Sequence, residues 1–123
     1  MTPDLENSFT GFDTLVEPRV VIDLPTLHRN LRTMAEIVDD RADLHPHVKT
    51  HKSLTIAKAQ RDYGAKGFTV ARAHEAKMLL EAGLDPVTIA YPLISTDTIT
   101  ALLMLAGDPC RLRFIADSDT GLA

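Results

Sequence analysis

Short β-rich runs and helical segments alternate along most of the chain, and this alternation constrains the fold more than any other feature. From Ala42 onward the β-rich runs begin about 20 to 25 residues apart, and each is followed by a segment with apolar residues at helical spacing. A strand, a helix and a short turn repeated at this interval are typical of a parallel sheet joined by crossover helices. The sequence therefore predicts an α/β fold.

The expected elements can be placed from the pattern and from their end signals. The predicted strands span residues 44–48, 67–71, 87–91 and 111–117. The predicted helices span residues 24–40, 54–63, 73–82 and 95–106. Pro25 suits the first turn of a helix, Ser53 can cap the next helix, and Gly64 and Gly83 are natural helix stops.

The number of strands leaves two architectures open. A closed (β/α)8 barrel takes eight strands and about 250 residues, whereas this chain of 123 residues shows four barrel-type strands. The sheet is therefore either an open doubly wound sheet or the N-terminal part of a barrel. The polar residues 1–16 are expected to form a loose arm, and residues 17–123 the folded domain.

Charge and composition exclude several classes of function. The net charge is −4, so the chain lacks the basic surface that a nucleic-acid backbone requires. No apolar run approaches the length of a membrane span, and the N-terminus lacks the charged start and apolar core of a signal peptide. We expect a cytoplasmic protein that acts on a small molecule, and not on nucleic acid or a membrane.

The segment LHPHVKTHKS, residues 44–53, is the part of the chain most crowded with titratable groups. Side chains alternate along a strand, so its first half divides into an apolar and a polar face. The apolar face carries Leu44, Pro46 and Val48, and the polar face carries His45, His47 and Lys49. In a βα barrel the apolar face meets the helices, and active sites form at the C-terminal strand ends. Lys49, as the last residue of this strand, is therefore predicted to lie at the mouth of a ligand site.

A lysine in that position has a specific chemical use. An ordinary lysine ammonium has a pKa of about 10.4 and is a poor nucleophile at neutral pH. Partial burial, or a second cation such as Lys52, lowers that pKa and frees the amine for Schiff-base formation. The alternative is a cluster of surface lysines at a strand end, and the pattern alone does not separate the two.

A zinc site is a rival interpretation of the same segment, because three imidazoles suit zinc. His45 and His47 share a strand face, and His51 could join them from the following loop. A lysine beside them would repel the cation, and the segment contains no carboxylate to complete or orient the set. We therefore expect no metal site here and interpret the histidines as the polar lining of a pocket.

Two further residues are candidates at the same rim. Glu75 opens a helix, where the helix dipole alone explains a carboxylate, and ligand contact is the alternative. Tyr91 ends the strand VTIAY and could touch a ligand or simply pack beneath Pro92. With Lys49 and His47, Tyr91 completes the set of expected ligand-binding residues.

Three longer stretches resemble a known family. They are EPRVVIDLPTLHRNLRTMAE, LHPHVKTHKSLTIAKAQRDYGAKGFTVARAHEAKMLLEAGL and VTIAYPLI, which cover nearly the whole chain from about Glu17 onward. They resemble the N-terminal part of fold-type III pyridoxal-phosphate enzymes, the relatives of alanine racemase, and especially the D-threonine aldolase and D-serine dehydratase branch. Members of that branch usually carry arginine before the PHVK motif, where this chain has His45.

The resemblance implies both a fold and a cofactor. The family fold is a βα barrel followed by a mainly β C-terminal domain, and Val20–Asp23 would be the strand that pairs with that distal domain. Residues 17–123 would then be a truncated cofactor-binding barrel domain with about four of its strands and without the C-terminal domain. Lys49 would form the internal aldimine with pyridoxal 5'-phosphate and then act as an acid and base, with His47 and Tyr91 as further cofactor-binding residues.

The resemblance also implies a reaction. The whole enzyme would be a homodimeric lyase acting on D-β-hydroxy amino acids, by aldolase-type carbon–carbon cleavage or dehydratase-type elimination. A divalent metal would bind the substrate hydroxyl through ligands near the C-terminus, beyond this chain. The alternatives left open are an amino-acid racemase and a non-catalytic barrel protein that carries pyridoxal phosphate. The 123-residue chain alone is expected to be poorly active.

Overall fold

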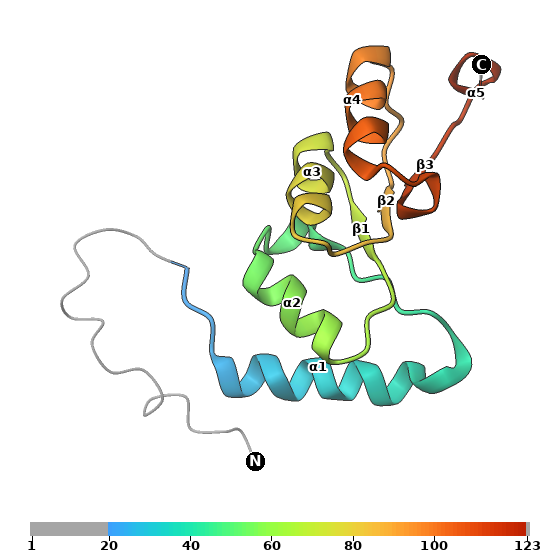
Figure 1. Ribbon diagram of the computed structural model, residues 1–123. Coiled ribbons are helices and arrows are strands. Elements are labelled where there is room, and N and C mark those ends of the chain that lie inside the picture. The colour runs from blue at the N-terminus through green and yellow to red at the C-terminus, as the bar shows by residue number, and fades with distance from the viewer. Residues whose placement is uncertain (1–19, 123) are drawn as a thin grey trace, which may run out of the picture.

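The computed structural model describes residues 20–122, and Figure 1 shows their arrangement. The helices are α1 (Leu24–Val38), α2 (Leu54–Asp62), α3 (Ala73–Glu81), α4 (Thr96–Ala106) and α5 (Asp119–Leu122). The strands are β1 (Phe68–Val70), β2 (Val87–Ile89) and β3 (Leu112–Phe114). Short 3-10 helices span Asp39–Arg41, Val48–Thr50 and Pro109–Arg111. The predicted α/β alternation is confirmed, and the arm predicted at residues 1–16 lies outside the described residues.

The three strands form one parallel sheet in the order β1-β2-β3. Each strand therefore lies beside the one that precedes it in the chain. Figure 1 shows α2, α3 and α4 on the same side of these strands, while α1 crosses below them. A doubly wound sheet reverses its strand order and carries helices on both faces, whereas a βα barrel adds each strand beside the last. The arrangement is that of a barrel segment.

The prediction of four strands is wrong in one place. The segment predicted as a strand at residues 44–48 is reduced to a single bridge, in which His47 pairs with Thr69 of β1. Pro46 has no N–H to donate, so it contributes only its carbonyl oxygen, which accepts from Thr69 at 2.9 Å. Val48 then turns into a 3-10 helix and ends the ladder.

Local end signals fix the helices close to where the sequence predicts them. Asp23 caps α1 by accepting from the N–H of Thr26 at 2.9 Å, and Pro25 lies in the first turn. The Ser53 hydroxyl accepts from the N–H of Ile56 at 3.4 Å and so caps α2. Gly64, just after α2, has a φ of 100°, a conformation that favours glycine.

The core lies between the sheet and the helices. Its strand side is formed by Phe68, Val70, Val87, Ile89 and Leu112, with Val48 from the 3-10 turn. Its helix side is formed by Ala57, Ala76, Leu79, Leu80, Leu102 and Ala106. Each fully buried aliphatic or aromatic side chain contributes about 1.5–3 kcal/mol relative to its exposed form. Leu79 and Leu80 on α3 are therefore core residues, whereas Met104 near the end of α4 is 79% exposed.

Charged side chains hold together the edge of the sheet where the strands begin. The Arg61 guanidinium donates to the carbonyl oxygens of Ala65 at 3.0 Å and Asp85 at 2.6 Å. The Arg111 guanidinium pairs with the Asp85 carboxylate at 2.8 Å and donates to the carbonyl oxygen of Ala106. These contacts join the loops before all three strands, which is the stabilising edge of a βα fold.

The strand that the resemblance implies at Val20–Asp23, paired with a distal domain, does not form among the described residues. These residues have no regular secondary structure, and Val20 is 94% exposed. A strand needs a neighbour for its ladder of hydrogen bonds, and no strand in residues 20–122 pairs with this segment. Among the same residues, no helix combines the length and apolar character required to cross a bilayer.

Candidate functional site

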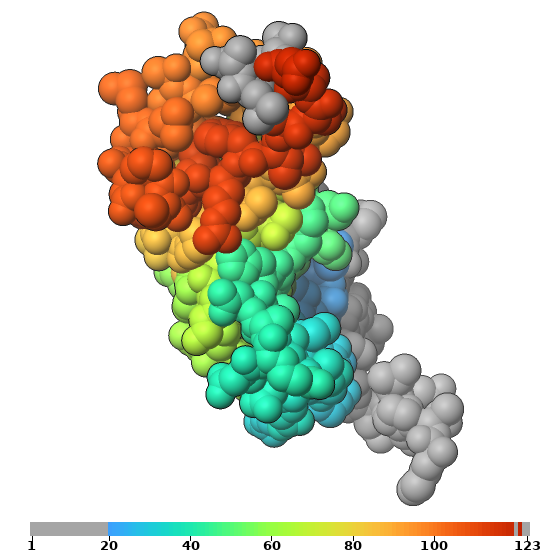
Figure 2. Space-filling view, turned by 90° about the vertical axis from the view of Figure 1, so that its right-hand side faces the viewer, coloured from blue at the N-terminus to red at the C-terminus, as the bar shows by residue number. Residues whose placement is uncertain are grey.

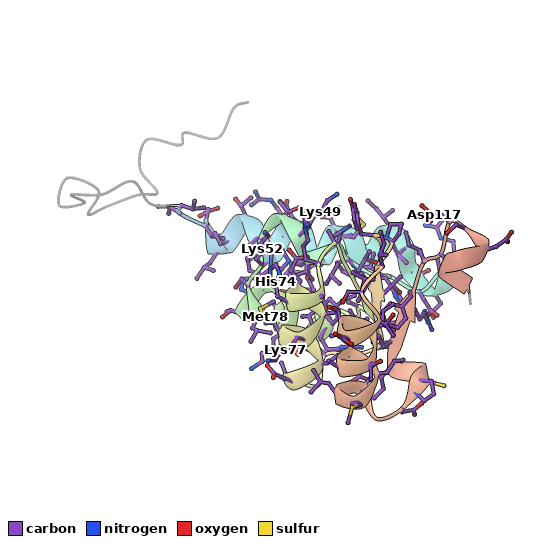
Figure 3. All side chains as sticks on the ribbon, turned by 90° about the horizontal axis from the view of Figure 1, so that it is seen from above. Lys49, Lys52, His74, Lys77, Met78 and Asp117 are labelled. Carbon is purple, nitrogen blue, oxygen red and sulfur yellow. The ribbon has the colours of Figure 1, made fainter. Side chains whose placement is uncertain are left out.

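Lys49 lies at the carboxyl edge of the sheet, in the 3-10 helix Val48–Thr50 and not at the end of a strand as predicted. This turn follows the bridged residue His47, so Lys49 still lies just beyond the point where the segment pairs with β1. Its side chain is exposed. Figure 3 labels Lys49 and Lys52 near this edge and Lys77 farther along α3.

Hydrogen bonds close the turn around Lys49. The N–H of Lys49 donates to Nδ1 of His47 at 3.2 Å. The carbonyl oxygen of Val48 accepts from the N–H groups of His51 at 3.2 Å and of Lys52 at 2.9 Å. Val48 itself is fully buried among the core residues, so the backbone of the turn is fixed from below while the amine of Lys49 stays in solvent.

A row of polar residues crosses the sheet on the face opposite the helices. The register pairs His47 with Thr69, Thr69 with Thr88, and Thr88 with Arg113. The residues on either side of each strand's middle position pack into the core, so these middle residues point the other way. Figure 2 shows the molecule from the right-hand side of Figure 1, the side away from α2, α3 and α4. Barrel interiors are usually filled by branched apolar side chains, so a polar row next to Lys49 suits a polar ligand.

Sequence reasoning missed this row, although the sequence contains its signal. The strands read FTV, VTI and LRF, each with a polar residue between two apolar ones. The alternation shows which residues turn away from the core. Only the register shows that Thr69, Thr88 and Arg113 line up with His47.

His45 occupies space that a glycine leaves open. A Cβ added at Gly67 would lie 2.4 Å from Cε1 and 2.7 Å from Nδ1 of His45, and 2.8 Å from the carbonyl oxygen of Pro86. His45 therefore lies against the backbone of Gly67, on the same face as His47, as strand alternation predicts. The ring of His45 can lie at this position because Gly67 has no side chain.

Two histidines of the segment, His47 and His51, accept hydrogen bonds from backbone N–H groups. Nδ1 of His47 accepts from Lys49, and Nδ1 of His51 accepts from the N–H of Ser53 at 3.1 Å. Burial lowers the pKa of His47, helped by the Lys49 charge and opposed by Glu75. Burial also lowers the pKa of His51, against the opposing effects of Gln60 and Ser53. Within residues 20–122, no three metal-ligating side chains gather at one point.

Glu75 is a buried carboxylate at the same edge. Its Oε2 accepts from the N–H groups of Ala71 at 3.0 Å and Arg72 at 3.1 Å, and its Oε1 lies 3.5 Å from Nζ of Lys52. Burial would raise its pKa, but the two N–H groups and Lys52 together hold the pKa below the ordinary value. The predicted place at the start of a helix is confirmed. The contact with Lys52, 23 positions earlier, could not be read from spacing.

Tyr91 follows β2 at the same edge and is 57% exposed. The guanidinium carbon of Arg72 lies 5.7 Å from the centre of its ring, a cation–π distance. The predicted residues therefore form two groups. His47 and Lys49 are hydrogen-bonded to each other, whereas the partner of Tyr91 is Arg72.

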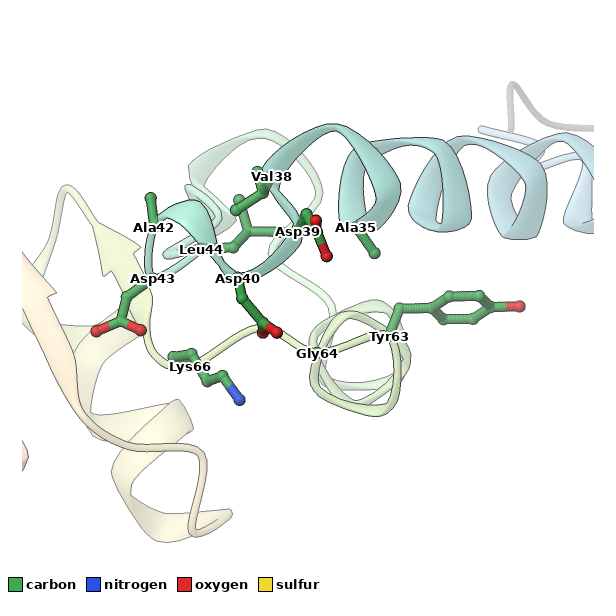
Figure 4. Close-up of a pocket in the computed structure, with 10 residues that line it drawn as sticks. All are labelled: Ala35, Val38, Asp39, Asp40, Ala42, Asp43, Leu44, Tyr63, Gly64 and Lys66. Atoms are coloured by element: carbon green, nitrogen blue, oxygen red, sulfur yellow. The ribbon is translucent and has the colours of Figure 1, made fainter.

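A cavity of about 260 Å³, shown in Figure 4, has no residue of the Lys49 turn in its lining. It is bordered by the end of α1 and by residues before β1, including Asp39, Asp43, Tyr63 and Lys66. Because Lys66 precedes β1, this cavity belongs to the edge where the strands begin. Chemistry in βα folds is built at the opposite edge, so the cavity is not a candidate for the site.

The sequential parallel sheet, with its polar inner row and a lysine turn at its carboxyl edge, is a segment of a βα-barrel domain. The chain belongs to the alanine racemase N-terminal domain family, whose match spans residues 22–105.

Two curated relatives are similar to most of the chain. It is 38% identical over 106 residues to D-threo-3-hydroxyaspartate dehydratase of Delftia sp. (strain HT23), and the aligned region covers 85% of the chain and 28% of that protein. It is 34% identical over 91 residues to D-threonine aldolase of Arthrobacter sp., which covers 72% of the chain and 24% of that protein. The chain therefore spans about a quarter of the length of each.

Solved structures agree with these matches. The D-threo-3-hydroxyaspartate dehydratase of Delftia sp. HT23 superimposes with a TM-score of 0.77 at 37% identity, over 88% of the chain and 28% of that protein. The D-threonine aldolase of Filomicrobium marinum superimposes with a TM-score of 0.71 at 33% identity, over 81% of the chain and 27% of that protein. A variant of a D-threo-3-hydroxyaspartate dehydratase has also been solved in a metal-free form.

Proposed function

We propose that this chain is the N-terminal part of a pyridoxal-phosphate-dependent lyase that acts on D-β-hydroxy amino acids, with Lys49 as the residue that attaches the cofactor. The observation that carries the proposal is the place of Lys49. Its exposed amine follows the bridged end of the first barrel segment, beside a polar row on the inner face of the sheet. The similarity to a hydroxyaspartate dehydratase and a threonine aldolase supports the substrate class.

The residues present fit such a cofactor. Within residues 20–122, Lys52 and Lys77 each pair with a glutamate, whereas no carboxylate lies within ion-pair distance of Lys49. An amine that is not held by a carboxylate is available for covalent attachment to an aldehyde. When bound, pyridoxal phosphate supplies an electron sink for bonds at Cα of an amino acid.

Each residue of the site has a proposed task. Lys49 would hold the cofactor, and its amine could then give or accept a proton at the substrate. His47 has a lowered pKa, so it stays neutral and holds the Lys49 backbone through Nδ1. Tyr91, oriented by Arg72, contributes to cofactor binding from the end of β2.

The whole protein has further requirements that these residues do not supply. We propose that a divalent metal binds the substrate hydroxyl through ligands outside this chain, in keeping with the metal-free form solved for a D-threo-3-hydroxyaspartate dehydratase variant. The whole protein is proposed to be cytoplasmic and to form a homodimer. A size measurement of the full-length protein tests whether it is a dimer. The 123-residue chain alone is expected to turn over little substrate. Clear glycine or pyruvate production from a D-amino acid would contradict that expectation.

Covalent attachment to Lys49 is the direct test of the proposal. The chain is mixed with pyridoxal phosphate, reduced with borohydride, digested and mapped by mass spectrometry. We expect a pyridoxyl group on Lys49 that is lost in Lys49→Ala and kept in Lys58→Ala, which removes an exposed lysine on α2. Label spread evenly over the surface lysines, with no preference for Lys49, would refute the assignment.

A further inference from the structure

Glu75 has more contacts than a helix cap requires. A capping-box glutamate needs one oxygen, which accepts from the N-cap N–H. Here Oε2 alone receives both N–H groups, from Ala71 and Arg72. The second oxygen, Oε1, reaches Nζ of Lys52. Glu75 is only 2% exposed and is the one charged residue buried among residues 20–122, so its charge is placed against Lys52 at the cost of desolvation.

Lys52 adopts a backbone conformation that a lysine avoids. Its φ is 47°, in the left-handed region where a side chain with a Cβ is disfavoured. Such a conformation persists where surrounding contacts hold it. The contacts present are the N–H bond from Lys52 to the carbonyl oxygen of Val48 at 2.9 Å and the ion pair with Glu75.

The residue held in this way closes the turn that carries Lys49. Lys52 and His51 both donate to Val48 and so complete the turn after Lys49. Through Lys52, the carboxylate of Glu75 joins this turn to the end of β1 and the start of α3. Three segments that meet at the carboxyl edge of the sheet are thus connected by one buried side chain.

We propose that Glu75 is a positioning residue for Lys49: its ion pair with Lys52 holds the turn Val48–Thr50 against the end of β1 and so fixes the Lys49 amine at the site. The inference rests on the proposed function for its catalytic meaning, because it concerns the residue proposed to attach the cofactor. It assigns the ion pair between Glu75 and Lys52 a task that neither helix capping nor the helix dipole explains.

Substitutions can separate the two tasks of Glu75. In Glu75→Gln the side chain still accepts from the helix N-terminus, since glutamine also serves in capping boxes, but the charge that meets Lys52 is gone. Lys52→Met removes the same ion pair from the other side, and Lys52→Arg keeps it. Lys77→Met is the matched control, because Lys77 pairs with Glu81 at 3.7 Å on the exposed surface of α3.

Two measurements follow the turn and the amine. The first is the hydrogen-exchange rate of the His51 and Lys52 amides, which needs no cofactor. The second is the rate at which pyridoxal phosphate attaches to Lys49. There the Lys49 nitrogen forms a C=N bond to the aldehyde carbon, the aldehyde oxygen leaves as water, and borohydride then supplies the hydride that fixes the product for mapping.

We expect Glu75→Gln and Lys52→Met each to speed amide exchange and to slow attachment by about two- to fivefold, which is the size of a partly exposed ion pair. The double variant is expected to be no worse than the stronger single variant, because both remove one interaction. Lys52→Arg and Lys77→Met are expected to match the parent protein. Melting temperatures of Glu75→Gln and Lys52→Met should fall by only a few degrees, since the ion pair is lost but the helix cap is kept.

Several results would overturn the inference. It fails if amide exchange at His51 and Lys52 is unchanged in both single variants, or if Lys77→Met has the same effect as Lys52→Met. It also fails if the two substitutions act additively. If the parent chain shows no preferred attachment at Lys49, the proposed function fails, while amide exchange still decides whether Glu75 holds the turn. If Glu75→Gln does not fold, Lys52→Met, at an exposed side chain, decides the question.

Discussion

Replacing Gly67 by alanine should strongly destabilise the protein, because three atoms already occupy the place of the new methyl group. The added Cβ would lie 2.4 Å from Cε1 of His45, 2.7 Å from its Nδ1 and 2.8 Å from the carbonyl oxygen of Pro86. The imidazole can rotate away, but the Pro86 oxygen is backbone and accepts from the N–H of Phe68 at 2.9 Å. Overpacking of this kind costs about 1–3 kcal/mol, and two obstructions place Gly67→Ala near the upper end.

The two obstructions can be measured separately. In a His45→Ala background the imidazole is gone and only the carbonyl oxygen of Pro86 remains, so Gly67→Ala should then cost about 1 kcal/mol. The free energy of unfolding of the four proteins is measured by urea titration followed by far-ultraviolet circular dichroism. The reasoning is refuted if Gly67→Ala is neutral, or if it costs the same with and without His45.

Three further predictions concern other parts of the fold. Leu79→Ala removes a fully buried side chain and should lower the free energy of unfolding by about 3 kcal/mol. Leu103→Ala, at a 42% exposed position, should change the free energy of unfolding by less than about 0.5 kcal/mol. Urea titration measures both changes. Burial lowers the pKa of His51 in the folded protein, so as the pH falls the unfolded chain binds a proton before the folded protein does. The stability that neutral His51 contributes is therefore complete above about pH 6.5 and decreases below it. His51→Asn, which keeps an acceptor for Ser53, should flatten this loss in melting curves between pH 7 and pH 5, and an unchanged slope would assign it elsewhere. Lys52→Gly relieves a left-handed φ that costs a lysine about 1 kcal/mol, but it also removes the ion pair with Glu75. The two effects should nearly cancel in the melting temperature, while attachment of pyridoxal phosphate at Lys49 slows. A large loss of stability would contradict this.

Features governed by neighbouring residues could be predicted from the sequence. Ser53 caps α2 and Pro25 enters the first turn of α1 because both effects act within one helical turn. The apolar residues of β1 and β2 pack on the helices because strand alternation leaves them one face. The place of Lys49 near the carboxyl edge of the sheet followed from the same alternation.

Features that depend on distant partners could not be predicted. The length of a strand is set by its neighbours, so Val20–Asp23 forms none and the segment before Lys49 keeps only the bridge at His47. The polar row needs the register of three strands, which no single strand contains. The contact between Lys52 and Glu75 joins residues that no periodicity relates.

The sequential order of the strands also determines how the sheet can be assembled. Phe68 pairs with Val87, and Val87 with Leu112, so each pairing closes a loop of only about 20 to 25 residues, and loop-closure entropy rises slowly with such lengths. Contacts between near neighbours in sequence favour fast folding. Because each strand pairs with its predecessor, the sheet can grow one βα unit at a time in the direction of synthesis. The partners of the Lys49 turn lie in β1 and α3, so every contact that holds this turn precedes β3 in the chain.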